Sequence, residues 1–420
     1  MRTLIVSDLH LGSGTRSDLL RRAELRAPLL EALADVDRLV LLGDVLELRH
    51  GPPREALAAA RPFFEDLGRA LADRELVMTA GNHDHALVEP WLAGRGAQAA
   101  PQALGVERLL AVRHASPMLE QIADWASPAR TVAAYPGLWI RPDVYAMHGH
   151  YLDCHLTVPT LERLSVAAMS RVLGRPASTF SRAEDYEAVA GPVFAWRDAV
   201  ARDVRTGSAL NGLATVSAWR ALRGGGSKED GSVPDTAAAP RLAERDSGLD
   251  VRGESSGVFA AARRSAVRNL RRRALVGAFP LAVAALNRAG LGPLRAAIST
   301  SELRRAGLLA IGEVAARLDL GEAYVVFGHT HRAGPLPGDH ESEWRGRGGA
   351  RLVNSGCWTY DPIFLTPTPG ESPYWPGTAI LVEDSGPPVV KRLLLDRAHE
   401  ELAQGRSSSG VRSDPTMPVE

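Results

Sequence analysis

The chain has 420 residues, of which 45% are apolar and 23% are charged, an ordinary composition for a soluble globular protein with a sizeable core. Its 49 Lys and Arg residues balance 49 Asp and Glu residues, so no long-range field draws it to a nucleic-acid polymer or an anionic membrane. Its two cysteines exclude a disulfide framework. Because the apolar start is too short for a signal peptide, the sequence predicts a cytoplasmic protein.

Five short apolar runs each end in a polar cluster. They are Thr3–Val6, Leu39–Leu42, Leu76–Thr79, Val144–Met147 and Tyr324–Phe327. Each run is rich in β-branched or large apolar residues and is too short for a helix, which is typical of a buried strand. Helical spacing of apolar residues over 19–33 and 54–71 places helices between the first three runs. This alternation predicts a parallel sheet, and all five polar clusters fall beyond the carboxyl ends of strands.

The later chain divides into strands and a long helical region. Residues 131–150 predict a hairpin that turns at Arg141-Pro142-Asp143. The stretches 350–353, 378–382 and 389–395 have the pattern of closing strands and suggest a second sheet packed on the first. We therefore expect one domain built from residues 1–150 and 320–400. A helical insertion at 151–319 would carry a flexible loop at 224–257, and residues 405–420 would form a disordered tail.

The polar clusters supply candidate metal ligands: two carboxylates, one amide oxygen and four imidazoles. These are Asp8, His10, Asp44, Asn82, His148, His329 and His331. This mixture of oxygen and nitrogen donors suits Mn²⁺, Fe²⁺, Zn²⁺ or Co²⁺. Two cations about 3.5–4 Å apart could share one carboxylate, for which we choose Asp44. A water on such a pair loses its proton near neutral pH and becomes the nucleophile, while the second cation offsets charge on the phosphoryl oxygens.

The same clusters resemble a known family. Asp8-x-His10, Gly43-Asp44, Gly81-Asn82-His83-Asp84, His148-Gly149 and Gly328-His329-x-His331 look like the five signature blocks of the calcineurin-like metallophosphoesterases. The resemblance covers residues 1–150 and 320–400 and implies a four-layer α/β/β/α sandwich with a dinuclear centre, manganese first among the metals.

The resemblance also assigns roles to residues. It implies that one metal is held by Asp8, His10, Asp44 and His331, and the other by Asp44, Asn82, His148 and His329. His83 would be the general acid that protonates the leaving oxygen, and Asp84 would orient it. The implied reaction is hydrolysis of a phosphomonoester, phosphodiester or pyrophosphate by a metal-bridging hydroxide.

Two stretches narrow the resemblance. Residues 7–12 and 43–47 resemble the UDP-2,3-diacylglucosamine hydrolase group, whose lipid-binding lid also follows the fourth block. That group has Arg where this sequence has His83. At this position the sequence instead resembles the general phosphoesterase pattern. The expected substrate is a small-molecule or lipid-linked phosphate rather than a nucleic-acid polymer. The alternatives are a UDP-sugar-lipid pyrophosphohydrolase-like enzyme and a non-catalytic scaffold.

A few other residues keep two interpretations. The apolar stretch 274–286 follows a basic cluster at 271–273. It predicts a helix buried against the catalytic domain, with peripheral membrane contact through the insertion as the alternative. His150 could contact the substrate phosphate or compete with His148 as a ligand, and the alternative is an ordinary buried histidine. Cys154 and Cys357 have the pattern of inert thiols, and we interpret Cys357 as a buried small residue.

Overall fold

The computed structural model describes residues 1–98, 102–202, 281–295 and 300–405. Its strands form a seven-stranded sheet in the order β12-β11-β1-β2-β3-β5-β4 and a five-stranded sheet in the order β6-β7-β8-β10-β9. The first sheet contains β1 (Thr3–Val6), β2 (Arg38–Leu42), β3 (Glu75–Thr79), β4 (Leu109–Ala111), β5 (Arg130–Ala134), β11 (Thr378–Val382) and β12 (Val389–Arg392). The second contains β6 (Gly137–Arg141), β7 (Val144–Met147), β8 (Tyr324–Phe327), β9 (Ala333–Gly334) and β10 (Arg351–Ser355).

The five predicted strands form the centres of the two sheets. In the first sheet β1, β2, β3 and β5 are parallel, and in the second β7, β8 and β10 are parallel. The predicted hairpin is confirmed, since β6 pairs antiparallel with β7. Parallel strands end at the same edge of a sheet, so the polar clusters are gathered at one edge of each sheet.

The predicted membership of the second sheet is partly wrong. Of the three closing strands only β10 joins it, whereas β11 pairs antiparallel with β1 and β12 pairs with β11 in the first sheet. The side of β1 that faces away from β2 needs a hydrogen-bonding partner, and β11 supplies it with Ile380 opposite Ile5. The pattern of a closing strand does not reveal which sheet has that open edge.

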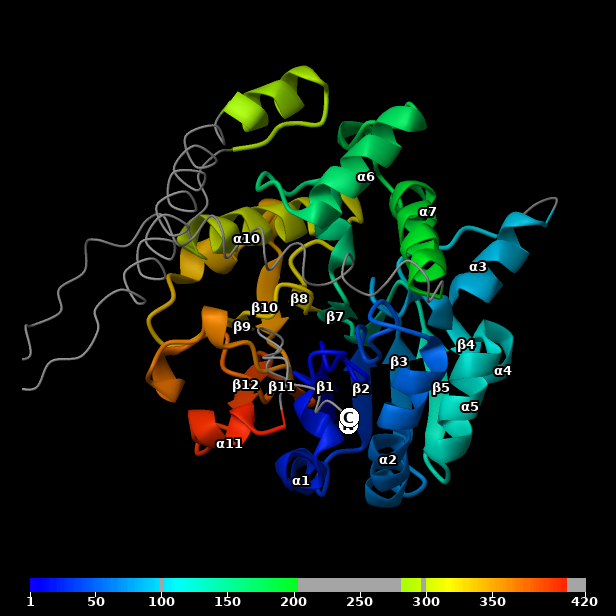
Figure 1. The fold of residues 1–420 in the computed structure, drawn as a ribbon, viewed down its shortest axis with the longest axis vertical. Helices are drawn as coiled ribbons and strands as arrows, with labels where there is room; N and C mark the ends of the chain where they lie inside the picture. Colours follow the sequence, from blue (N-terminus) through cyan, green and yellow to red (C-terminus); the bar gives the residue numbers. More distant parts are fainter. Residues whose placement is uncertain (99–101, 203–280, 296–299, 406–420) are drawn as a thin grey trace, which may run out of the picture.

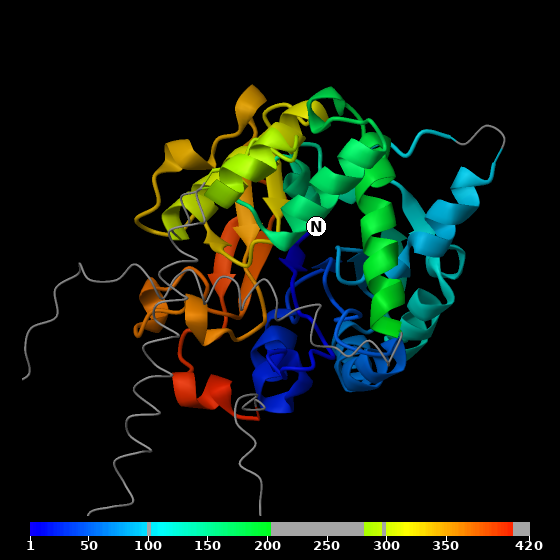
Figure 2. The ribbon, with the colours of Figure 1, turned by 45° about the horizontal axis from the view of Figure 1, so that its top comes forward.

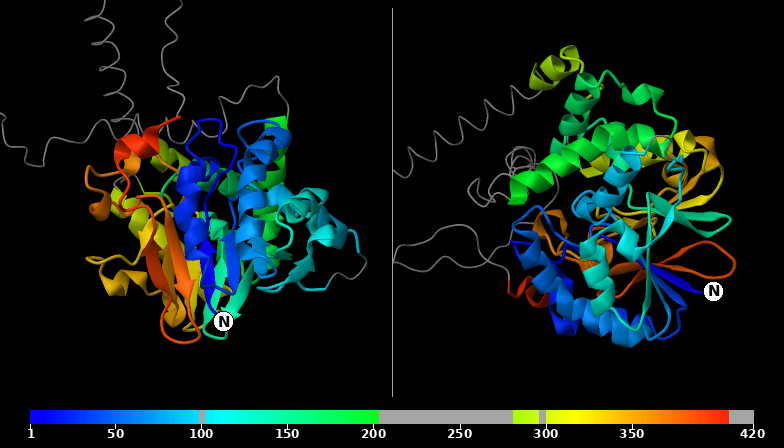
Figure 3. Two further views of the ribbon diagram at one scale, coloured as in Figure 1. Left: turned by 90° about the horizontal axis from the view of Figure 1, so that it is seen from below. Right: turned by 90° about the vertical axis from the view of Figure 1, so that its right-hand side faces the viewer.

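Residue alternation along the strands builds the layers. In β1, Leu4 and Val6 pack in a core that also contains helix residues, while Ile5 packs in a core made of strand residues from both sheets. In β8, Val326 and Phe327 divide between the two cores in the same way. Because successive side chains point to opposite faces, each sheet packs on the other sheet with one face and on helices with the other. This arrangement is the expected α/β/β/α sandwich (Figure 3).

Helices cover both outer faces. The described helices are α1 (Ala23–Ala32), α2 (Pro53–Leu71), α3 (Glu89–Gly96), α4 (Val112–Ala115), α5 (Pro117–Trp125), α6 (Leu161–Val172), α7 (Ala183–Arg202), α10 (Thr300–Arg317) and α11 (His399–Ala403). The predicted helix at 54–71 is confirmed as α2. The one at 19–33 is interrupted, because Arg22 is extended (φ −94°, ψ 129°) and separates a 3₁₀ turn from α1.

The described part of the insertion is helical. It contains α6, α7, residues 281–288 and α10, and α6, α7 and α10 lie across the sheets from α1 and α2 (Figures 1 and 2). The predicted flexible loop at 224–257, the basic cluster at 271–273 and tail residues 406–420 lie outside the described residues. Among the residues that the structure describes, each helix is too short or too polar to cross a membrane.

Candidate metal centre

The metal centre is assembled where strand ends from both sheets meet. Asp8 and His10 follow β1, and their backbone N–H groups donate to the carbonyls of Gly43 and Asp44 at 3.2 and 2.9 Å. In the second sheet the N–H of Gly328 donates to the carbonyl of His148 at 2.9 Å. These bonds continue the sheet pairing past the strands, so donors far apart in sequence are held at fixed spacing.

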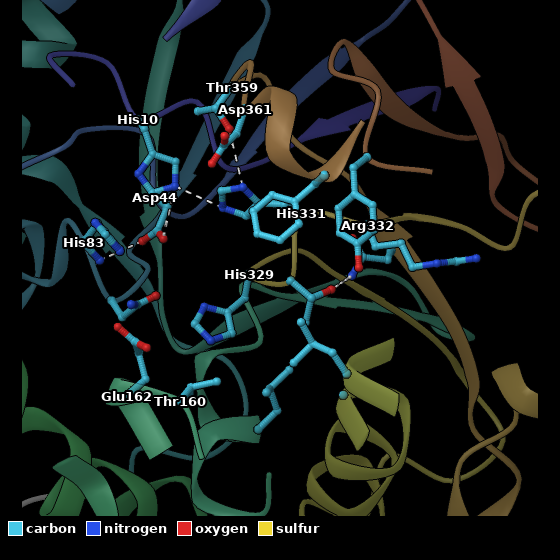
Figure 4. A pocket seen from close by; sticks show the side chains of 18 of the residues that line it. His10, Asp44, His83, Thr160, Glu162, His329, His331, Arg332, Thr359 and Asp361 are labelled. Carbon is cyan, nitrogen blue, oxygen red and sulfur yellow. Dashed lines mark hydrogen bonds and ion pairs between the residues drawn. The ribbon is translucent and has the colours of Figure 1, made fainter. Parts of the chain in front are cut away.

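The seven predicted ligands converge, and we call them the cage: Asp8, His10, Asp44, Asn82, His148, His329 and His331. Candidate donors of Asp8, His10 and His331 lie within 4.8 Å of one another, and so do those of Asp44, His148 and His329. Between the groups, Oδ2 of Asp44 lies 3.3 Å from Nε2 of His148 and 3.7 Å from Nε2 of His10. Figure 4 shows Asp44 between His10 and His329. One carboxylate therefore reaches both groups, as a bridging ligand requires.

Each cage imidazole directs one ring nitrogen into the cage, and its other ring nitrogen contacts an oxygen atom outside the cage. Nδ1 of His10 lies 3.1 Å from Glu47, and Nδ1 of His148 lies 3.0 Å from the carbonyl of Leu42. The outer nitrogens of the other two imidazoles also have oxygen partners: Nε2 of His329 lies 3.1 Å from Asp153, and Nδ1 of His331 lies 3.4 Å from Thr359. Metal-ligating histidines are oriented in this way, because the outer acceptor fixes the tautomer and leaves a lone pair for the cation.

The cage residues have an unusual backbone. Five of them are in the left-handed region, namely Asp8 (φ 55°), His10 (φ 48°), Asp44 (φ 50°), His329 (φ 65°) and His331 (φ 60°). That conformation is unfavourable for residues with a Cβ and gathers at functional sites, at about 1–3 kcal/mol each. The backbone thus turns sharply after β1, β2 and β8, and the side chains there are aimed inward rather than along the sheet.

Glycines in the motifs allow the two sheets to approach closely at the cage. A Cβ on Gly43 would lie 2.6 Å from Cγ of His148, and one on Gly328 would lie 2.3 Å from Oδ2 of Asp8. A Cβ on Gly81 would lie 2.2 Å from Oδ1 of Asp44. No larger residue fits at these three positions without moving a cage side chain, which explains the glycines that precede Asp44, Asn82 and His329.

Buried charges in the cage stabilise one another. Burial alone raises the pKa of Asp8, but His331 opposes this and brings that pKa to about 2. Burial lowers the pKa of His148, and Asp44 more than reverses this, raising the pKa to about 9. Each carboxylate thus favours positive charge in the cage. A divalent cation would satisfy the same carboxylates, so the chemistry of the donor set fits a metal.

His83 lies at the rim of the cage, but the residue predicted to orient it does not contact its ring. Nδ1 of His83 lies 2.9 Å from Oε2 of Glu47. The carboxylate of Asp84 instead accepts from four backbone N–H groups, those of Gly81 and residues 44–46. Asp84 therefore ties the loop after β3 to the loop after β2, which corrects the role expected from the sequence.

Sequence reasoning missed Glu47 and Asp153. Glu47 is buried and contacts both His10 and His83, and Asp153 holds His329 from the 3₁₀ turn η3 (His150–Cys154). The sequence did point to Glu47, because it follows Asp44 by three residues in the second motif. Asp153 had only its position just after the fourth motif.

A cavity of about 360 Å³ lies over the cage, and its lining is mixed in character. The lining includes five apolar residues, which we call the wall: Leu152, Leu156, Leu303, Leu308 and Trp344. It also includes Ser13, Thr15 and Ser17, whose hydroxyl groups lie within 3.2 Å of one another in pairs. His150 does not line this cavity; it is buried, and no hydrogen-bond partner is found for either of its ring nitrogens within the described residues.

Comparison with known proteins agrees with the geometry. Residues 1–176 match the family profile described as calcineurin-like phosphoesterase. No curated protein matches the chain significantly. The matched region contains β1, β2, β3 and β7 with the donors that follow them, and the second sheet brings His329 and His331 to the same point. Residues 1–176 therefore form a calcineurin-like phosphoesterase domain, and members of that family are metal-dependent hydrolases of phosphate esters.

Proposed function

We propose that the cage holds two divalent ions and that the protein hydrolyses a phosphate ester with an apolar organic group. Asp8, His10, Asp44 and His331 would hold one ion, and Asp44, Asn82, His148 and His329 the other. The observation that carries the proposal is the convergence of four inward-facing ring nitrogens, each on an imidazole whose other nitrogen has an oxygen partner outside the cage. The mixed oxygen and nitrogen donors favour Mn²⁺, with Fe²⁺, Zn²⁺ and Co²⁺ as competitors.

Bound ions of this kind supply an activated water and offset charge on the phosphoryl oxygens. The remaining steps belong to the protein. His83 borders both the cage and the cavity, so it is placed to give a proton to the leaving oxygen. Burial lowers the pKa of His83 to about 4, although Glu47 acts in the opposite direction. An anionic phosphate beside the ring adds negative charge and raises that pKa when substrate is bound.

The shape of the cavity supports an ester with two unlike ends. The wall would exclude water from an apolar group, while Ser13, Thr15 and Ser17 line the same cavity and would offer hydroxyl groups to a polar group. Nearby guanidinium groups are already paired: Arg332 bonds Asp339 at 3.0 Å, and Arg304 pairs with Glu343 at 2.8 Å. A lipid-linked phosphate has the required amphipathic character, and it is the substrate class we place first.

The test uses purified protein freed of metal by chelation and then given Mn²⁺. We expect hydrolysis of a phosphomonoester, diester or pyrophosphate, with KM falling along a series of alkyl phosphates of increasing chain length. Elemental analysis should give about two ions per chain. Two bound ions without turnover on the whole panel would favour the non-catalytic scaffold. Turnover that does not depend on chain length would support a phosphoesterase but contradict the proposal that its substrate has an apolar group.

A further inference from the structure

Arg49 is a buried cation directly behind the cage. It lies seven residues after β2, its side chain is 1% exposed, and its Nη2 donates to the backbone carbonyl of Asn82. Its guanidinium also lies over the ring of Phe194 in α7, 5.5 Å from the ring centre. Arg49 therefore touches a predicted ligand on one side and the insertion on the other.

The side-chain amide of Asn82 has its two ends in opposed surroundings. One end lies 3.0 Å from Nδ1 of His329, 3.2 Å from Nε2 of His148 and 3.3 Å from Oδ2 of Asp44. The other end lies 3.0 Å from Nη1 of Arg49. A guanidinium can only donate, so hydrogen bonding favours the amide oxygen at Arg49 and the NH₂ group at the cage.

A metal ligand requires the reverse orientation. Asn binds a cation through its oxygen, so the oxygen must face His148, His329 and Asp44. The NH₂ group then faces Nη1 of Arg49, and two donors oppose each other. The amide oxygen can serve the guanidinium or the cation, but it cannot serve both.

We propose that Arg49 is a positioning residue that competes with the second ion for the oxygen of Asn82, and that Asp198 of α7 moderates this competition. Oδ1 of Asp198 lies 4.0 Å from Nε of Arg49, so its charge draws the guanidinium towards α7 and away from the amide. The inference rests on the proposed function, because it requires Asn82 to be a ligand.

The position of α7 is itself fixed from the core. Oε1 of Glu187 accepts from the hydroxyls of Tyr135 and Tyr151 at 2.5 and 2.6 Å, and Oε2 lies 3.2 Å from Nε2 of His85. Glu187 is thus a buried anchor that holds α7, and with it Asp198, beside the cage. The insertion consequently influences how firmly the second ion is bound, without supplying a ligand to it.

Calorimetric titration of the metal-free protein with Mn²⁺ tests the proposal. We expect two binding steps in the wild type, and the step lost in Asn82→Ala identifies the second site. Arg49→Met keeps an unbranched side chain without a donor, so it should tighten that step about tenfold, the effect of one charge-assisted hydrogen bond. The first step, which does not involve Asn82, should keep its affinity.

Two further variants separate this mechanism from a general effect. Asp198→Asn should weaken the second step, the opposite sign to Arg49→Met, whereas simple damage to the fold would weaken binding in both. Arg61→Met is the control, because it removes an exposed cation of α2 that bonds Glu65 at 2.7 Å. It should leave the second step unchanged.

The outcomes are distinguishable from failure of the proposed function. A wild-type protein that binds one ion overturns the dinuclear centre and this inference with it. Two ions in the wild type, with an unchanged second step in Arg49→Met or equal tightening of both steps, overturn the role of Arg49 alone.

Discussion

The cage and the wall border the same cavity, yet they are built by different means. Cage donors come from strand ends, and five of the seven have a left-handed backbone, which sets the direction of the Cα–Cβ bond. The wall residues Leu303 and Leu308 come from α10, and Leu152 and Leu156 come from η3 and the residues just after it; Trp344 completes the wall. All of them contact the cavity through apolar surface. Directional bonds fix the cage, whereas the wall depends on non-directional burial. Small displacements should therefore be costly in the cage and tolerated in the wall.

The largest effect is expected for Asp44→Asn. The change removes the charge that reaches both groups of donors, so both ions should be lost and kcat/KM should fall by at least about 10³-fold, or about 4 kcal/mol. Elemental analysis and turnover are the measurements, with Asp143→Asn on the exposed part of the β6–β7 hairpin as control. Retention of both ions would show that Asp44 does not bridge them.

A smaller loss is expected for His83→Ala. The ring lies at the rim and its partner is Glu47, so the variant should keep its metal while kcat falls by about 10²–10⁴-fold. A matched pair of substrates sharpens the test. The loss should shrink for an ester with a good leaving group, such as a nitrophenyl phosphate, because that group departs without a proton. Equal loss for good and poor leaving groups would argue against proton donation.

Asp153→Asn acts at the border between the two regions, because Asp153 lies in the turn below the wall but holds His329. We expect about 10–100-fold weaker binding of one ion, which is usual for a carboxylate behind a ligating histidine. The other ion should bind as in the wild type. If both ions bind normally, His329 is oriented by its backbone alone.

The smallest effect is expected in the wall. Leu303→Ser removes apolar surface from the cavity and leaves the cage intact, so KM for a long alkyl phosphate should rise by up to about tenfold with kcat unchanged. Leu309→Ser is the control, since Leu309 is 62% exposed and outside the cavity lining. A drop in kcat would mean that the wall also positions the reacting group.

The cage could be predicted from the sequence and the wall could not. Each donor follows a short apolar run, and strand pairing alone brings such positions together. The family resemblance assigned Asp84 to orient His83, yet the oxygens of Asp84 accept from four backbone N–H groups. Glu47 reaches the ring only through the folded loop. Strand β11 was placed in the wrong sheet because its pattern does not encode the edge that it covers.

The left-handed backbone of the cage has a consequence for engineering. Five positions that need a functional side chain hold the conformation that glycine adopts with least strain. Selection of random variants for heat resistance alone would therefore favour glycine at these positions and yield stable proteins without activity. A directed-evolution campaign on this molecule should score turnover and melting temperature in the same round.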